Sequence, residues 1–145
     1  MTFYRFDYSN FPEVKILFIG NIETKYLKAL FDEWLSIYNY KKPYCMICDT
    51  TSILNNPPIT FIPSLVKFIK KLKKKNPQYL TKSIMIANDS ILSKCILNGA
   101  MALTSPVSDL YIYWKKENEN AINVNNINMI LQRAPTLFQI IKSNN

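Results

Sequence analysis

The sequence predicts a single α/β domain with a mostly parallel central sheet of four to five strands and about four helices. Short apolar segments rich in branched residues alternate with longer amphipathic segments, as in the strand–helix repeats that build parallel sheets. Segments 45–48 and 83–87 are almost continuously apolar, which is typical of strands covered on both faces. The chain of 145 residues suits one domain, 1–145, with a core over 13–133 and a C-terminal tail over 134–145.

The N-terminal part of the chain predicts two strands and then a helix. Residues 2–9 form a candidate edge strand, and the branched residues of 13–22 predict the first central strand. Residues 24–40 predict a helix, because large apolar side chains recur there at helical spacing. These side chains are Leu27, Leu30, Phe31, Trp34, Leu35 and Tyr38.

The middle of the chain predicts a strand over 43–53 and a helix over 58–77. Pro43 and the Asn-Asn-Pro-Pro segment bound the strand, and Pro63 suits the first turn of the helix. The helix has one apolar stripe, which we expect to face the core. The stripe consists of Ile62, Leu65, Val66, Ile69 and Leu72.

The C-terminal part repeats the pattern. Residues 81–89 predict a strand, 90–103 a helix capped by Asp89 or Ser90, and 108–115 the last strand. Residues 119–133 predict a weaker helix. In the helix over 90–103, the side chains expected to face inward are Ile91, Leu92, Cys95 and Ile96.

Cys45 and Cys48 form a Cys-x-x-Cys pair, a spacing that metal sites and dithiol redox sites use. Both chemistries need two sulfurs that face the same small volume. Residues three apart in a strand point to opposite faces of the sheet, so this pair predicts buried free thiols instead. The chain has no histidine and only Cys95 besides, and we expect no metal site.

Asp49 falls where we expect the strand over 43–53 to leave the sheet, at the carboxyl edge where open α/β folds place their sites. One interpretation is a small-molecule or lipid pocket near Asp49 and Asn88. The other is structural: the Asp49 carboxylate accepts hydrogen bonds from the following loop and fixes its turn.

The segment Lys67–Lys75 is the strongest electrostatic feature of a chain with a formal net charge of +8. Lys67, Lys70, Lys71 and Lys74 fall mostly opposite the apolar stripe of the predicted helix, and they form a candidate anion-binding surface. Nucleic acid and an anionic membrane both fit such a surface. A solvated basic face that covers a core helix fits it as well.

Enzyme chemistry and targeting signals find little support in the sequence. Without histidine, Ser-His and Cys-His pairs are excluded, and no phosphate-binding loop or dinucleotide fingerprint is present. We therefore expect neither catalysis nor a cofactor. Residues 1–12 do not resemble a secretory leader, no apolar run reaches membrane-spanning length, and the three cysteines indicate a reducing, cytoplasmic environment.

Three segments carry a resemblance to the STAS / anti-sigma-factor-antagonist-like superfamily: ILFIGNIETKYLKALFDEWLSIY, YCMICDTTSI ending in an acid, and KSIMIANDSILSKCILNGAMALTSPVSDLYIYWKKENENA. The chain resembles this family over residues 13–133. The resemblance implies a small module that recognises other proteins. It also implies a phosphorylated Ser or Thr where the second helix starts, and Thr60 is the nearest hydroxyl, although the family's Asp-Ser-(Ser/Thr)-Gly signature is missing.

The sequence thus predicts a non-enzymatic interaction module that binds a protein partner, or a second copy of itself, through its edge strand and loops. A basic module that binds nucleic acid or anionic membrane through Lys67–Lys75 is the first alternative. A small-molecule or lipid pocket near Asp49 is the second.

Overall fold

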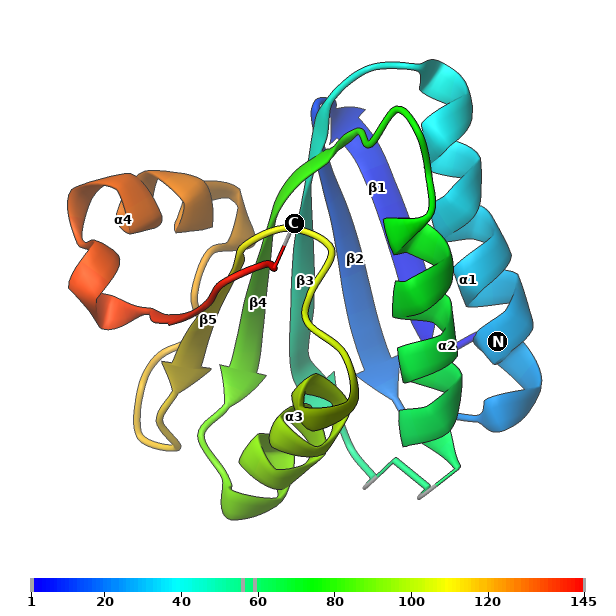
Figure 1. Cartoon of the computed structure of the whole chain (residues 1–145). Coiled ribbons are helices and arrows are strands. Elements are labelled where there is room, and N and C mark those ends of the chain that lie inside the picture. Colours follow the sequence, from blue (N-terminus) through cyan, green and yellow to red (C-terminus); the bar gives the residue numbers. More distant parts are fainter. Residues whose placement is uncertain (1, 56, 59, 145) are drawn as a thin grey trace.

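A computed structural model describes residues 2–55, 57–58 and 60–144 of the chain, and it contains one six-stranded sheet (Figure 1). The strands lie side by side in chain order. β2, β3, β4 and β5 run parallel, while β1 and β6 pair antiparallel at the two edges. The strands are β1 (Tyr4–Asn10), β2 (Glu13–Gly20), β3 (Tyr44–Ile53), β4 (Leu80–Asn88), β5 (Leu110–Lys115) and β6 (Gln139–Ile141).

Four α-helices connect and cover the strands. Short 3-10 turns extend the helix between β2 and β3 at both ends, so a helical segment spans 24–40 as the sequence predicts. A further 3-10 turn precedes the last helix. The helices are α1 (Leu27–Ser36), α2 (Phe61–Lys73), α3 (Ile91–Leu103) and α4 (Ile127–Arg133).

The strand order determines where the helices lie. Each of the three parallel connections steps to the next strand in the same direction, and right-handed crossovers of this kind leave their helices on one face. α1 and α2 pack over the cluster around Val14 and Met46 on this face. α3 follows α2 closely, since a Cβ on Gly99 would lie 3.6 Å from Ile62.

The opposite face of the sheet is covered by α4. Ile127 and Leu131 of this helix pack on Ile84 and Ile86 of β4. Asn128 accepts a hydrogen bond from Lys82 Nζ at 2.6 Å and donates one to Glu13 at 3.1 Å. The short helix is therefore tied to both β4 and β2.

The structure corrects several predictions about the sheet. It is mixed rather than mostly parallel, because both edge pairings are antiparallel, and it has six strands rather than four to five. The predicted C-terminal tail contains the edge strand β6, and the helix predicted over 119–133 is regular only over Ile127–Arg133. Three-residue strands such as β6 carry too little alternation to be recognised from sequence.

The prediction for α3 is wrong for Ile91, Leu92 and Cys95, whereas Ile96 is partly buried. Ile91 is 85% exposed, Leu92 and Cys95 are exposed too, and Ala100 is the buried residue of this helix. Residues 91–97 place apolar side chains on every side of the helix. The spacing of apolar residues therefore did not reveal which side of α3 meets the sheet. Ser90 caps the helix as predicted, its Oγ accepting from the Ser93 amide at 3.1 Å.

Among the residues that the structure describes, no helix combines the length and the apolar composition that a membrane span requires.

Candidate functional site

The ends of β2, β3, β4 and β5 form the carboxyl edge of the sheet, shown at the bottom of Figure 1 together with the start of α3. Open α/β folds commonly bind ligands at this edge, because the loops that leave the strands meet there. The loop after β3 is fixed to β2: Asn55 accepts from the Ile22 amide at 2.7 Å and donates to the Ile22 carbonyl at 3.3 Å. Leu54 N donates to the Gly20 carbonyl at 2.8 Å.

Asp49 and Asn88, the two residues predicted for a pocket, are brought together through Thr51. Asp49 Oδ1 accepts from the Thr51 amide at 3.0 Å and from the Thr51 hydroxyl at 2.6 Å. Asn88 donates to the Thr51 carbonyl at 3.0 Å. These bonds fix the last part of β3, where its pairing with β2 is irregular, and they support the structural interpretation of Asp49 over the pocket.

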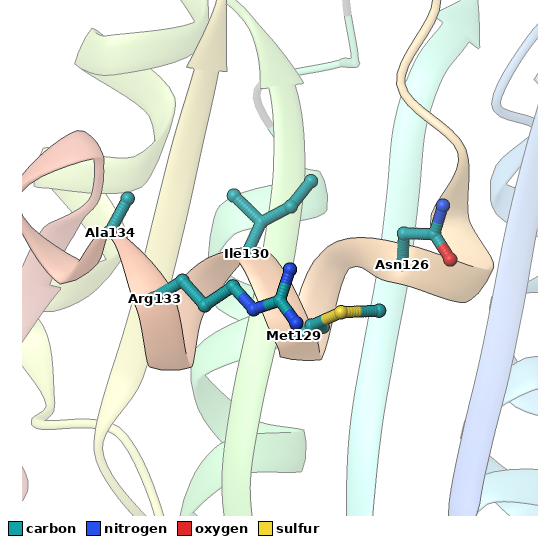
Figure 2. Close-up of a pocket in the computed structure, with 5 residues that line it drawn as sticks. All are labelled: Asn126, Met129, Ile130, Arg133 and Ala134. Carbon is teal, nitrogen blue, oxygen red and sulfur yellow. The ribbon is translucent and has the colours of Figure 1, made fainter.

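Two surface hollows of about 420 Å³ stand out in the described part of the chain, and both lie away from Asp49 and Asn88. The first is lined by five residues along α4 and just after it, and Arg133 extends along the helix toward Met129 (Figure 2). A hollow with one helix as its wall provides no convergent polar groups for a ligand. The second lies between the end of α3 and the residues after β6.

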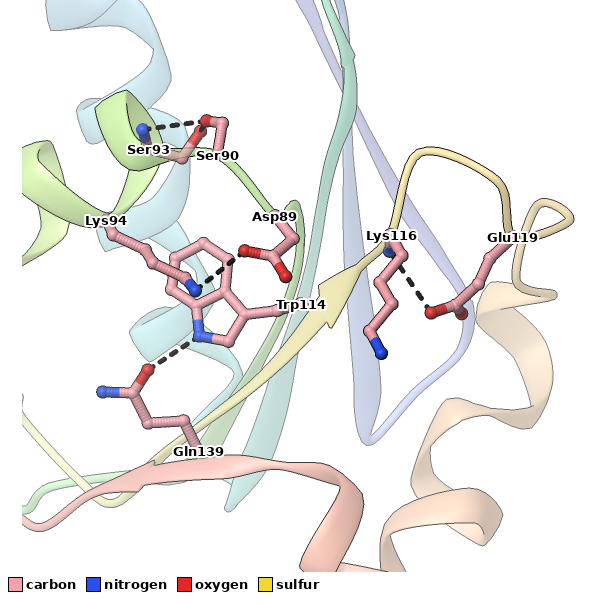
Figure 3. A network of polar contacts seen from close by, with 8 residues as sticks. All are labelled: Asp89, Ser90, Ser93, Lys94, Trp114, Lys116, Glu119 and Gln139. Carbon is pink, nitrogen blue, oxygen red and sulfur yellow. Dashed lines mark hydrogen bonds and ion pairs between the residues drawn. The ribbon is translucent and has the colours of Figure 1, made fainter.

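A polar cluster fixes the start of α3 to the last two strands (Figure 3). Lys94 Nζ lies 2.8 Å from Asp89 Oδ1 and 5.4 Å from the centre of the Trp114 ring. The Trp114 indole N–H donates to Gln139 of β6 at 2.7 Å. The single cation of α3 is therefore already paired with an anion and an aromatic ring.

The loop after β5 is fixed in a similar way. Glu119 accepts from the Tyr113 hydroxyl at 2.7 Å. It also accepts from the Lys116 amide at 3.3 Å (Figure 3). Both hydrogen bonds lower the pKa of the Glu119 carboxyl, and the bond from Tyr113 has the larger effect. Glu119 is thus held in its charged form as an acceptor for its own loop.

The most distinctive surface at this edge is apolar. Leu54, in the loop after β3, is 81% exposed, and Ile19 at the end of β2 is also exposed. α3 adds the residues that define what we call the α3 outer face: Ile91, Leu92, Cys95, Ala102 and Leu103, all exposed. This surface was not predicted, because the apolar first residues of α3 were expected to face the core.

Thr60 lies at the N-terminal cap position of α2 and is exposed. Its side chain does not make the capping hydrogen bond that threonine often makes at this position. The Thr60 carbonyl accepts from the Ser64 hydroxyl at 3.2 Å. The hydroxyl predicted as a phosphorylation site thus stands at the surface, at the amino end of a helix.

The basic segment divides into two groups. Lys67, Lys70, Lys71 and Lys74 are exposed, and these four define the α2 lysine stripe. Two further lysines have structural contacts. Lys73 donates to the Ser105 hydroxyl at 2.6 Å, and Lys75 lies 5.7 Å from the centre of the Tyr38 ring.

The paired cysteines face opposite sides of β3, as the sequence predicts. Cys45 belongs to the core under α4, while Cys48 packs against the core under α1 and α2. All three cysteines are free thiols. Burial raises the pKa of Cys45 to about 11 and that of Cys48 to about 12. Within the described ranges, no three His, Cys, Asp or Glu side chains gather as a metal site.

In the folded protein, a thiol reagent such as dithionitrobenzoate is expected to react rapidly with Cys95 alone at pH 8. Cys95 is exposed, whereas Cys45 is buried and Cys48 is partly buried, and both remain protonated thiols at that pH. In denaturant, three thiols per chain should react. A Cys95→Ser variant should show no fast phase, and rapid reaction of two or more thiols in the native protein would contradict the packing of β3.

Compared with known proteins, the chain matches no protein-family model, no curated protein and no solved structure.

Proposed function

We propose that this chain is a non-enzymatic interaction module of STAS-like type that binds a protein partner through the α3 outer face. The observation that carries the proposal is the unusual composition of that face. A helix that is apolar on all sides is normally enclosed by protein, yet α3 exposes Ile91 and Leu103 to solvent. A partner that covers these side chains would remove them from water.

The electrostatics of α3 favour a protein partner as well. Lys94 is the one charged residue of the helix, and Asp89 neutralises it. An apolar, nearly neutral patch with a polar rim is typical of the centre of a protein interface. Two copies of this face would meet without charge repulsion, so a second copy of the chain is an acceptable partner despite its positive net charge.

The N-terminal edge strand is the weaker docking surface. β1 lies at the sheet edge as predicted, but Arg5 and Asp7 are exposed on it and its register with β2 is irregular between Asp7 and Asn10. Charged side chains and bulges are the means by which proteins prevent strand addition at an edge. We therefore assign docking to α3 and the adjacent loops.

The resemblance to STAS-like domains agrees with this role, because it implies protein recognition and places a phosphorylated hydroxyl near Thr60. Thr60 is exposed at the amino end of α2. The free amides at that end of the helix would stabilise a phosphate on its hydroxyl. The absence of histidine from the chain favours binding over catalysis, and three free thiols favour a reducing, cytoplasmic compartment.

Site-specific photocrosslinking tests the proposed function. A photoreactive phenylalanine analogue replaces Ile91 in one version of the chain and Met129 in another, and both are produced in the cells that naturally express it. Both positions are exposed, but Met129 lies on α4 at the opposite face of the sheet. Discrete adducts at position 91 and none at 129 are expected, together with loss of the adducts when Leu92 becomes Asp.

Light scattering over a concentration series distinguishes a second copy from a different partner. A mass that rises to twice 16.9 kDa, and falls back in Leu92→Asp, identifies self-association. Equal adducts at positions 91 and 129, or no adducts combined with a constant monomer mass, would overturn the proposal.

A further inference from the structure

The α2 lysine stripe occupies one side of a firmly packed helix. Residues 67, 70, 71 and 74 follow the i, i+3, i+4, i+7 spacing, so their side chains share one exposed face over about 10 Å of helix axis. The other side of α2 is buried: Phe68 stacks on Phe31 of α1 with ring centres 4.2 Å apart. The lysines are thus presented on a rigid element.

The charge of this stripe is not neutralised by neighbouring acids. Residues 50–88 contain seven lysines and neither Asp nor Glu. The ion pairs found among the described residues involve Lys25, Lys28, Lys94 and Lys142, and none involves the stripe. The surplus charge of the protein is therefore concentrated along α2.

The basic surface continues around the end of the sheet where the parallel strands begin. Lys75 lies over the Tyr38 ring, and Lys41 N donates to the Tyr38 carbonyl at 3.2 Å. Lys41 adopts a left-handed conformation with φ of 54°, and Lys41 and Lys42 are both exposed. The end of α1 lies at this same edge, at the top of Figure 1, and the loop after α2 also reaches it.

An exposed aromatic residue directly precedes Lys41 and Lys42 in the chain. Tyr40 is 55% exposed, and its ring contacts Phe11 at 5.4 Å and Tyr8 at 6.3 Å between ring centres. The contacts with Phe11 and Tyr8 support the ring while much of its surface remains in solvent. A supported aromatic ring beside cations is the arrangement on which unpaired bases stack.

We infer that the α2 lysine stripe, Lys41, Lys42 and Tyr40 form a binding surface for single-stranded nucleic acid. The stripe is long enough to contact a few successive phosphates of one strand. An unpaired base can stack on the Tyr40 ring, whereas a base paired inside a duplex cannot. The surface contains lysines rather than arginines, which are better suited to bidentate contacts with bases. We therefore expect binding that does not depend on base sequence.

The observations favour nucleic acid over an anionic membrane. Membrane-surface helices insert apolar side chains beside their cations, but the apolar side of α2 is buried in the core. The exposed apolar residues Leu54 and Ile91 lie at the carboxyl edge, the opposite end of the strands from Lys41 and Lys42. Leu54 and Ile91 therefore do not share a surface with Lys41 and Lys42.

Fluorescence anisotropy with a labelled 12-nucleotide oligo(dT) at 50 to 300 mM KCl tests the inference. Replacing Lys70, Lys71 and Lys74 by Gln is expected to reduce the slope of log K against log[salt] by about 2, since each phosphate contact contributes about 0.7. Affinity at 50 mM salt should fall roughly a hundredfold. Tyr40→Ala should weaken binding about tenfold and leave the slope unchanged.

A matched control removes the same number of charges elsewhere: Lys25, Lys28 and Lys116 become Gln. These side chains lie outside the proposed surface, and the control should bind like the parent chain. Failure of the parent to bind oligo(dT), or an equal loss in the control, would overturn the inference. Lysine-dependent binding to phosphatidylserine vesicles without binding to oligo(dT) would overturn it in favour of a lipid surface.

Discussion

Replacing Phe68 by Ala is expected to lower the free energy of unfolding by about 4 kcal/mol, the usual cost of deleting a fully packed aromatic ring. Phe68 is 5% exposed and lies at the contact between α1 and α2. Its ring stacks on Phe31 at 4.2 Å and meets the Trp34 ring edge-to-face at 5.3 Å. Truncation removes both contacts and leaves a cavity between two helices. Chemical denaturation followed by circular dichroism measures the loss.

Two variants control this experiment. Phe68→Leu retains most of the apolar volume and should cost clearly less than Phe68→Ala. Met129→Ala removes a side chain that is 43% exposed, and its effect should stay below about 1 kcal/mol. A loss below 1 kcal/mol for Phe68→Ala would show that the α1–α2 contact does not exist in solution.

The folded protein is also expected to lose stability steeply above pH 9. Burial raises the pKa of Cys45 to about 11 and of Cys48 to about 12, while the unfolded chain has ordinary thiols. Between these values the unfolded chain releases protons that the folded chain retains, so rising pH favours unfolding. Each thiol contributes about 1.4 kcal/mol per pH unit, which gives about 3 kcal/mol per unit for both. The pKa of the buried Tyr44 phenol is raised as well, and it adds to the loss above pH 10.

The comparison with a Cys45→Ala, Cys48→Ala variant isolates the thiols from the other titrating groups. This variant starts from a lower stability at pH 7, but its free energy of unfolding should fall less steeply between pH 9 and 11. Denaturation midpoints at four pH values in this interval measure the two slopes. Identical slopes would mean that the two sulfurs reach solvent in the folded state.

The elements with strong periodicity were predictable from the sequence. The strand over 43–53 and the helix over 24–40 occur where expected, because long runs of alternating or helical spacing leave little ambiguity. The opposite orientation of Cys45 and Cys48 follows from strand geometry alone and is confirmed. Asn88 ends β4, whereas Asp49 lies inside β3, which continues to Ile53, and both side chains form hydrogen bonds with Thr51 of that strand.

The remaining features depend on how elements pack, which one sequence does not encode locally. Phe68 lies off the predicted apolar stripe of α2, because this helix packs against both the sheet and α1. Which side of α3 is exposed depends on how the helix packs against the rest of the domain. β6 forms because Gln139–Ile141 reach the free edge of β5, a pairing that involves residues far apart in the chain.

The arrangement of strands in chain order has a consequence for biosynthesis. Each of the strands from β2 to β6 pairs with the strand translated just before it, so each of these strands finds a partner as soon as it is made. The domain can grow from its N-terminal hairpin outward during translation. The three residues of β6 arrive last and shield the final unpaired backbone of β5.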